Sequence, residues 1–440
     1  MNQPAVDHYT REFTGLQFDA PDWLSSIRRD AFDAFRSEGF PTLRHENWKY
    51  TDVRPLIKRE FCVPQQADEF DREFVKSAGF ADAGSHELVF TNGRYRDELS
   101  TSLPLPDGVI LQSLHSAMGA HKDLFQGFLN RHVAGRSPFV SLNTAFINDG
   151  VLLYIPDGVC LEQPVNLLFL ADSRQHPVAA HVRTLIILGE NAEATVIETY
   201  NGVPDAEYFT NAVTEIYTGA GASLEHYKLQ QESLRAYHIA YTNLRQDRDS
   251  RIESHAISLG GALARNDIHG DLAAPGASVE LSGLYLAGGR QHVDNHTHID
   301  HLQPNTTSRE NYRGVLDGHA RGVFNGKVVV HQDAQKSDAR QANSNLLLSD
   351  NAEVDTKPEL EIYADDVKCS HGATIGQLDD AMLFYLRSRA IDVETARSLL
   401  TFAFADEVIR KIRLEAVRNR LESIVVGKLP DTDVIKEFVK

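Results

Sequence analysis

Between Phe139 and Gly376 the chain is a succession of short alternating runs, and this pattern constrains the fold more than any other feature. Runs such as "VLLYI", "RTLIIL", "ATVIETY" and "KVVVHQ" are rich in β-branched residues and are bounded by Gly, Asn, Asp or Pro. Such runs are typical of strands. Since no helical pattern interrupts them, repeated strand–helix–strand units and a doubly wound parallel sheet are excluded.

A turn-to-strand phrase recurs in the same region, in the copies "GENAEATVIE", "GAGASLEHYKL", "APGASVELSGLY" and "SDNAEVDTKPELEIY". These copies fit a solenoid, in which each short strand buries its face only by stacking on its neighbours. An antiparallel sandwich is the alternative that the pattern leaves open. Hairpin signals such as Asn-Gly are scarce here, and this favours a parallel β-helix.

Helical patterns flank this core. Trp23, Leu24 and Ile27 recur at helical spacing, and good helix formers dominate the chain after Asp380. We therefore expect a mainly β protein with an N-terminal, largely helical region over 1–138, a parallel β-helix over 139–376 and a C-terminal helical domain over 377–440.

A solenoid needs its open end covered, so we expect the apolar residues of the C-terminal domain to pack on the last coil. Docking of a partner protein is the alternative. The residues concerned are Leu383, Phe384, Leu386, Leu399, Leu400 and Phe402.

The charge of the chain limits its partners. A net charge of −18 disfavours nucleic acid and anionic membranes, which are bound through Lys and Arg. The sequence has no apolar run of membrane-spanning length, and "MNQPAVDHYTREF" lacks the pattern of a signal peptide. Three cysteines far apart, Cys62, Cys160 and Cys369, suit a reducing compartment. We expect a cytoplasmic protein.

The segment "DDVKCSHGATIG" places Cys369 two residues before His371. On a strand both side chains point to one face, about 7 Å apart at the backbone, and could serve as two ligands or as a thiol beside a base. The motif by itself favours the simpler alternative, a small buried thiol and an ordinary polar histidine. Since Fe–S clusters typically take four cysteines, a cluster here would be transient or completed by His or by a second subunit.

The segment "RQHVDNHTHIDH" holds the densest group of histidines: His292, His296, His298 and His301. On a strand, His292, His296 and His298 share one face with Asp294 and Asp300, and imidazoles with carboxylates can bind a metal ion. The alternative is a polar ladder that faces solvent, with Val293 and Ile299 turned inward.

Motifs of several enzyme classes are missing. The chain has no G-x-x-x-x-G-K-[ST] phosphate loop, no G-x-S-x-G elbow and no H-E-x-x-H metal motif. We therefore expect no nucleotide bound by this chain and no enzymatic activity of these classes. A β-helix carbohydrate lyase or hydrolase remains an alternative, and it would need paired carboxylates or a Ca²⁺ site.

Several long phrases resemble one family. "DDVKCSHGATIGQLDDAMLFYLRSRAI" and "KSDARQANSNLLLSDNAEVDTKPELEIYADD" resemble the C-terminal signature of the SufB/SufD family of iron–sulfur cluster assembly scaffolds. "FVSLNTAFINDGVLLYIPDGV" is similar to the entry to that family's core, and "HENWKYTDVRPL" to its N-terminal helical segment. The "CSHGAT" form and the small number of cysteines are more similar to the SufD branch than to the SufB branch.

The resemblance implies a right-handed parallel β-helix in a complex with a SufB-like scaffold and a SufC-like ABC ATPase, which docks on the C-terminal helices. It implies that His371 faces the SufB-like partner of a heterodimer where a nascent Fe–S cluster forms. Cys369 matches the neighbouring motif cysteine. A homodimer through the same surface and a part in iron acquisition are further implications. The competing hypothesis is a metal-binding protein built on the ladder from His292 to His301.

Overall fold

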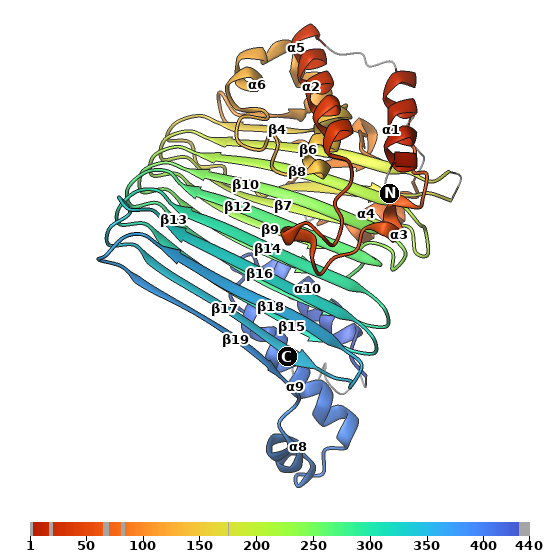
Figure 1. Ribbon diagram of the computed structural model, residues 1–440, viewed down its shortest axis with the longest axis vertical. Coiled ribbons are helices and arrows are strands. Elements are labelled where there is room, and N and C mark those ends of the chain that lie inside the picture. Colours follow the sequence, from red (N-terminus) through yellow and green to blue (C-terminus); the bar gives the residue numbers. More distant parts are fainter. Residues whose placement is uncertain (1–2, 17–20, 65–69, 81–83, 175, 431–440) are drawn as a thin grey trace.

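The computed structural model describes residues 3–16, 21–64, 70–80, 84–174 and 176–430 of the 440-residue chain. In this part of the chain two long sheets form a β-solenoid of about eight turns, flanked by helices. The coils are stacked along the long axis from β4 (Asp149–Ile155) to β19 (Lys368–Gly376) (Figure 1). Strands of neighbouring coils pair in parallel, so the predicted parallel solenoid is confirmed and the antiparallel sandwich is excluded.

The first sheet has ten strands in the order β19-β17-β15-β13-β11-β9-β7-β5-β1-β2. Besides β19, they are β1 (His86–Thr91), β2 (Arg94–Tyr95), β5 (Val165–Ala171), β7 (Glu193–Gly202), β9 (Ser223–Gln230), β11 (Arg251–Ser258), β13 (Ser278–Ala287), β15 (Thr307–Leu316) and β17 (Asp338–Leu347). The second sheet has nine strands in the order β18-β16-β14-β12-β10-β8-β6-β4-β3. Besides β4, they are β3 (Ile110–Ser113), β6 (Ala179–Leu188), β8 (Phe209–Thr218), β10 (Tyr237–Gln246), β12 (Leu263–Leu272), β14 (His292–His301), β16 (Arg321–Val330) and β18 (Glu353–Ile362).

The recurring turn-to-strand phrase has a conformational cause. Six strands of the first sheet, β7 to β17, each begin two residues after a residue with positive φ, which turns the chain into the strand. Gly and Asn adopt this left-handed conformation at low cost, which explains why they precede the strands. The six residues are Asn191, Gly221, Asp249, Gly276, Asn305 and Lys336.

Apolar side chains from the inner faces of both sheets fill the solenoid. Val196 and Leu224 of the first sheet meet Ile216 and Leu244 of the second in one continuous cluster, and all four are at most 1% exposed. Because the pairing is in register, equivalent positions of successive coils stack in rows that no single strand could bury. Hydrophobic burial therefore holds the coils together.

The N-terminal helices cover the outer face of the second sheet (Figure 1). An aromatic cluster joins them to Phe209, Tyr237 and Leu263 on that face. These elements are α1 (Gln3–Gly15), α2 (Asp22–Glu38), η1 (Glu46–Trp48), α3 (Arg54–Ile57), α5 (Leu114–Ala120), α6 (Lys122–Phe128) and α7 (Pro138–Ala145). The short α4 (Arg72–Ala78) packs on the first sheet instead, against Val89 and Leu168. A further turn, η2 (Asp97–Leu99), follows β2.

The C-terminal helices do not cover the last coil, so that expectation is wrong. Helices α9 (Val393–Ile409) and α10 (Glu415–Gly427) pack on the outer face of the first sheet, against Tyr227, Leu284 and Val315. That face offers them an apolar surface along the side of the solenoid, and Phe402 joins this cluster. Helix α8 (Asp380–Arg387) buries no residue, and Figure 1 shows it projecting beyond the end of the stack. Phe384 on α8 is 75% exposed.

The division at residues 138 and 376 stays a prediction. Strands β1, β2 and β3 precede residue 139 and extend both sheets at their first end, whereas α7 is a helix that begins at Pro138. No helix in the described ranges has the length and apolar character needed to cross a membrane.

Candidate functional site

The last coil of the solenoid ends in two edge strands. Within the described chain β19 pairs only with β17, and β18 pairs only with β16. The other edge of each strand presents backbone N–H and C=O groups that a further strand could pair with. The end of the stack is therefore a template for another chain.

Cys369 and His371 both lie on β19 and face the interior side of this last coil. Cys369 stands opposite Ala339 and His371 opposite Gln341, and both of these β17 residues are buried between the sheets. Cys369 packs against the edge of the main core, whereas His371 is exposed. Cys369 lies beside the turn residues Ala364 and Val367, which also pack on this core, whereas His371 lies further along the strand.

The chemistry of Cys369 is that of a protonated thiol. Its burial, together with the nearby Asp338 carboxylate, raises the pKa of the Cys369 thiol. Since the thiolate is the form that binds metal, Cys369 needs a cation or another positive group beside it to become a ligand. In the described part of the chain, neither Cys369 nor His371 belongs to a group of three or more converging ligands.

Apolar side chains are exposed around this end. Ile362 is the last residue of β18 and Tyr363 comes directly after it, while Ile375 lies near the end of β19. On α8, Phe384 and Tyr385 are also exposed. Exposed apolar residues in one region mark surfaces that bind other proteins.

The histidine ladder lies on β14, but its members do not converge. The three histidines of the outward face contact different partners: His292 Nε2 lies 3.0 Å from Thr51 Oγ1, and His296 Nε2 lies 3.0 Å from Asp294 Oδ1. His298 Nε2 lies 3.1 Å from Asp300 Oδ2. The ladder as a whole is therefore a row of separate contacts.

His301 faces the opposite way, into the solenoid. It is buried and lies 2.8 Å from the hydroxyls of both Thr306 and Ser308. Burial lowers the pKa of His301 to about 4, so this imidazole is neutral at physiological pH.

Two histidines that the sequence analysis missed join one member of the ladder. His269 on β12 and His331, just after β16, both lie beside Asp300, which also contacts His298. The sequence pattern that could have revealed them is His-x-Asp, which occurs once on β12 and again on β14. In the structure His269 and Asp271 stand opposite His298 and Asp300 of the next coil. It could be recognised only once the two strands were aligned.

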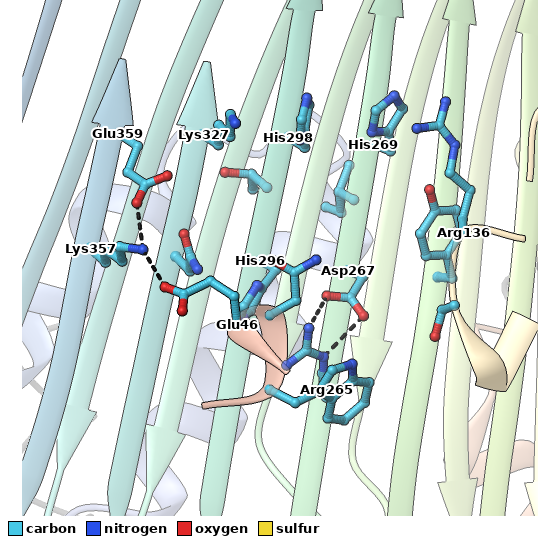
Figure 2. A pocket seen from close by; sticks show the side chains of 17 residues that line it. Glu46, Arg136, Arg265, Asp267, His269, His296, His298, Lys327, Lys357 and Glu359 are labelled. Carbon is cyan, nitrogen blue, oxygen red and sulfur yellow. Dashed lines mark hydrogen bonds and ion pairs between the residues drawn. The ribbon is translucent and has the colours of Figure 1, made fainter. Parts of the chain in front are cut away.

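A groove of about 280 Å³ runs beside this face, and Figure 2 shows His269, His296 and His298 along it. Its other lining residues include two groups of ion pairs that hold the segment around η1 on the solenoid. Lys357 Nζ lies 2.8 Å from a carboxylate oxygen of Glu46, and Arg265 bridges Asp267 and Asp294 at 2.8 and 2.6 Å.

Arg265 and Asp294 anchor the "HENWKY" segment. The guanidinium carbon of Arg265 lies 3.8 Å from the centre of the Trp48 ring, and the hydroxyl of Thr51 donates to Asp294. Burial by itself would raise the pKa of the Asp294 carboxyl, but Arg265 and His296 hold it well below its usual range. The buried carboxylate is thus charged and fully used in structural contacts.

A polar network also lies inside the solenoid. His238 Nδ1 lies 2.8 Å from Glu232 Oε2, and Lys228 donates to Asn266 at 3.0 Å. Burial lowers the pKa of Lys228 to about 8. Since these side chains are at most 5% exposed, they connect the coils and offer no route to a ligand.

Comparison with known proteins identifies the family. The family described as "SUF system FeS cluster assembly, SufBD core domain" matches residues 169–404, and the SufBD protein N-terminal region matches residues 1–167. The chain belongs to the SufBD family. It is 34% identical to an iron–sulfur cluster assembly SufBD family protein of Synechocystis sp., over 91% of this chain and 90% of that protein. It is 34% identical to the SufD protein of Escherichia coli over 89% of this chain and 90% of that protein, and 27% identical to SufD of Bacillus subtilis over 93% and 94%.

The two matched SufBD regions both contain residues of the contacts described above. His371, Asp300 and Arg265 fall in the matched core domain, and Trp48 and Thr51 fall in the matched N-terminal region. The stacking of Arg265 on Trp48 is thus a contact between the two SufBD regions, and it fixes how the N-terminal segment lies on the core.

Proposed function

We propose that this chain is a non-catalytic scaffold subunit of a SUF complex, in which it helps a SufB-like partner to build a nascent Fe–S cluster. The observation that carries the proposal is the last coil of the solenoid, where Cys369 and His371 lie on an uncovered interior face beside two unpaired strand edges. One imidazole and one thiol are too few to hold a cluster, so a second chain supplies the remaining ligands. The cluster is a transient product and belongs to the interface of the two chains.

The SufB-like partner docks on β18 and β19 in this proposal. Strand pairing across the open edges provides backbone hydrogen bonds, while Ile362, Tyr363 and Ile375 provide apolar contact. A second copy of this chain presents the same edges, and a homodimer therefore competes with the heterodimer for one surface. His371 is exposed at this surface, so it is positioned to reach across to the partner.

The SufC-like ATPase docks on the C-terminal helices, and α8 is the element that supports this part of the proposal. It buries no residue within the described chain and exposes Met382, Phe384 and Tyr385. Nucleotide binds to the ATPase and not to this chain. Because β19 leads directly into α8, movement of α8 on ATP hydrolysis can open or close the edge that carries His371.

Three unpaired cysteines and a role in Fe–S assembly both fit a reducing compartment, and we place the complex in the cytoplasm. A contribution to iron acquisition would be consistent with this role.

The test is anaerobic co-expression of the chain with a SufB-like and a SufC-like protein, followed by purification of the complex. We expect His371→Ala to lower cluster absorption and bound iron severalfold while the complex stays intact on size-exclusion chromatography. Ser370→Ala is the matched control, because Ser370 is the exposed neighbour that points to the opposite face of β19. Unchanged iron and absorption in His371→Ala would refute the assigned role of this residue.

A further inference from the structure

We propose that His269, His298, His331 and Asp300 form a binding site for one divalent transition-metal ion. This site is separate from the last coil and does not rest on the function proposed above. It replaces the ladder hypothesis, because it takes only one histidine of the outward face and adds two from neighbouring coils.

The carboxylate of Asp300 is the centre of the cluster. Its Oδ2 lies 3.1 Å from His298 Nε2 and 3.4 Å from His269 Nε2, and its Oδ1 lies 2.8 Å from His331 Nε2. Two ligand atoms that bind one ion at about 2.1 Å can be at most about 4.2 Å apart. One ligand atom from each of His269, His298 and Asp300 lies within 4.8 Å of the others, close to the separation that one ion requires. His331 lies outside this group of three and contacts Asp300 Oδ1, so its imidazole has to move toward the other two to join them on the ion.

The strands hold these side chains in place before any ion binds. His269 stands directly opposite His298 in the parallel ladder between β12 and β14, and the two ring centres are 4.7 Å apart. His331 continues the backbone pairing of β14 with β16 by one residue, since its backbone N–H donates to the carbonyl of His301 at 3.0 Å. Ligands on rigid strands lose little freedom on binding, which favours affinity.

The charge and exposure of the cluster also suit a cation. Asp271 and Asp300 supply two carboxylates, and Arg245 lies 3.2 Å from Asp271 only. Among the described residues the ion-pair contacts of Asp300 are all with imidazoles, so its charge has no permanent cation beside it. His269 is 6% exposed at the back of the site, while His298 and His331 are 37% and 45% exposed at the front. An ion can therefore enter from solvent and keep open coordination positions.

The donor set selects the class of metal. Three imidazoles and a carboxylate suit Fe²⁺ or Zn²⁺, whereas Mg²⁺ and Ca²⁺ prefer oxygen ligands only. Asp271 Oδ1 lies 3.0 Å from the same His269 Nε2 and places a second carboxylate beside the site.

The experiment uses the full-length chain, stripped of metal and titrated without oxygen with Fe²⁺ or with Zn²⁺. Bound metal is counted by mass spectrometry after equilibrium dialysis, and Co²⁺ provides a visible spectrum that reports ligand geometry. We expect one equivalent of bound ion, and at least a tenfold weaker Kd in His298→Ala and in Asp300→Asn. His331→Gln should weaken binding too, and it provides a variant at a more exposed position if the changes at His298 or Asp300 impair folding.

Three control variants make the assignment specific. His296→Ala removes a histidine from the same face of β14 but outside the cluster, and it should bind metal as the wild type does. Cys62→Ser tests the group formed by His8, Glu12 and Cys62, and His371→Ala tests the last coil. Absence of binding to the wild type, or binding that is lost in a control variant and kept in His298→Ala, would overturn the proposal. Failure of cluster assembly in His371→Ala with metal binding intact would separate this site from the scaffold function.

Discussion

Replacing Arg265 with Met should release the N-terminal segment around η1 from the solenoid. The Arg265 side chain is 2% exposed, and it pairs with Asp294 at 2.6 Å and with Asp267 at 2.8 Å. Its guanidinium also covers the ring of Trp48 at 3.8 Å. Methionine fills a similar volume but removes both ion pairs and the stacking, so the change tests the electrostatic part of this anchor.

The expected loss of free energy depends on the charge that stays buried after the substitution. Removing one partner of a buried ion pair typically costs about 3–5 kcal/mol, because the other charge is left uncompensated. Asp294 keeps its contacts with Thr51 and His296, so we expect the lower half of that range, about 3–4 kcal/mol. Since each 1.4 kcal/mol is a factor of ten, the population of detached segment should rise roughly 10²–10³-fold.

Tryptophan fluorescence can measure this detachment, because the chain has only two tryptophans and Trp48 is one of them. In a Trp23→Phe background, the emission of Trp48 should shift to the red at lower denaturant concentration in Arg265→Met. Lys357→Met is the control, since Lys357 contacts the same segment through Glu46 in solvent. If the Trp48 emission shifts at the same denaturant concentration in Arg265→Met as in Lys357→Met, the reasoning is refuted.

Three further predictions concern other parts of the chain. Burial raises the pKa of the Glu310 carboxyl from 4.5 to about 7, so the folded state holds a proton that the unfolded state releases, and stability should fall as pH rises across that range. Glu310→Gln should remove this part of the slope, as measured by the unfolding midpoint between pH 5 and pH 8 relative to wild type. Gly283→Ala would place a methyl group 2.1 Å from the ring of Tyr312 and should cost about 1–3 kcal/mol of unfolding free energy, whereas Gly372→Ala, with open space around it, should not. Phe384→Asp on α8 should abolish co-purification of the ATPase without lowering the melting temperature, because Phe384 is 75% exposed; a lowered melting temperature would indicate a structural role.

The repeating part of the fold could be predicted because its cause is local. Alternation at a period of two shows which residues of a strand are buried, and residues such as Asn191 and Gly276 show where the chain must turn. Both signals recur in the coils from β7 to β17, so an error in the position of one strand does not affect the next. The parallel solenoid, and the opposite directions of Val293 and His292 on β14, follow from these signals.

The position of the C-terminal helices could not be predicted in this way. The outer face of the first sheet is apolar at Tyr227, Leu284 and Val315, and those residues belong to strands that also bury their inner faces. A strand that is apolar on both faces does not show from its own sequence what covers its outer side. The helices therefore lie along the side of the solenoid, although apolar helices after a solenoid suggest a cap.

The cluster at Asp300 was missed for a related reason. Its ligands come from β12, β14 and the residue after β16, and only the pairing of successive coils brings them side by side. Register between strands depends on where each turn closes, which a single strand does not encode. The ladder on β14 was visible because its residues are contiguous in the sequence, yet of its histidines only His298 belongs to the cluster.

The two ends of the solenoid differ, and this difference supports the placement of function at the second end. At the first end β3 pairs antiparallel with β4, and helix α5 packs on both of these strands. At the other end β18 has no buried residue, and on β19 only Cys369 is even partly buried. An edge of this kind promotes aggregation unless another chain covers it, and its exposure carries a cost in stability. The uncovered second end, which carries His371, is thus the end that the proposed SufB-like partner would cover.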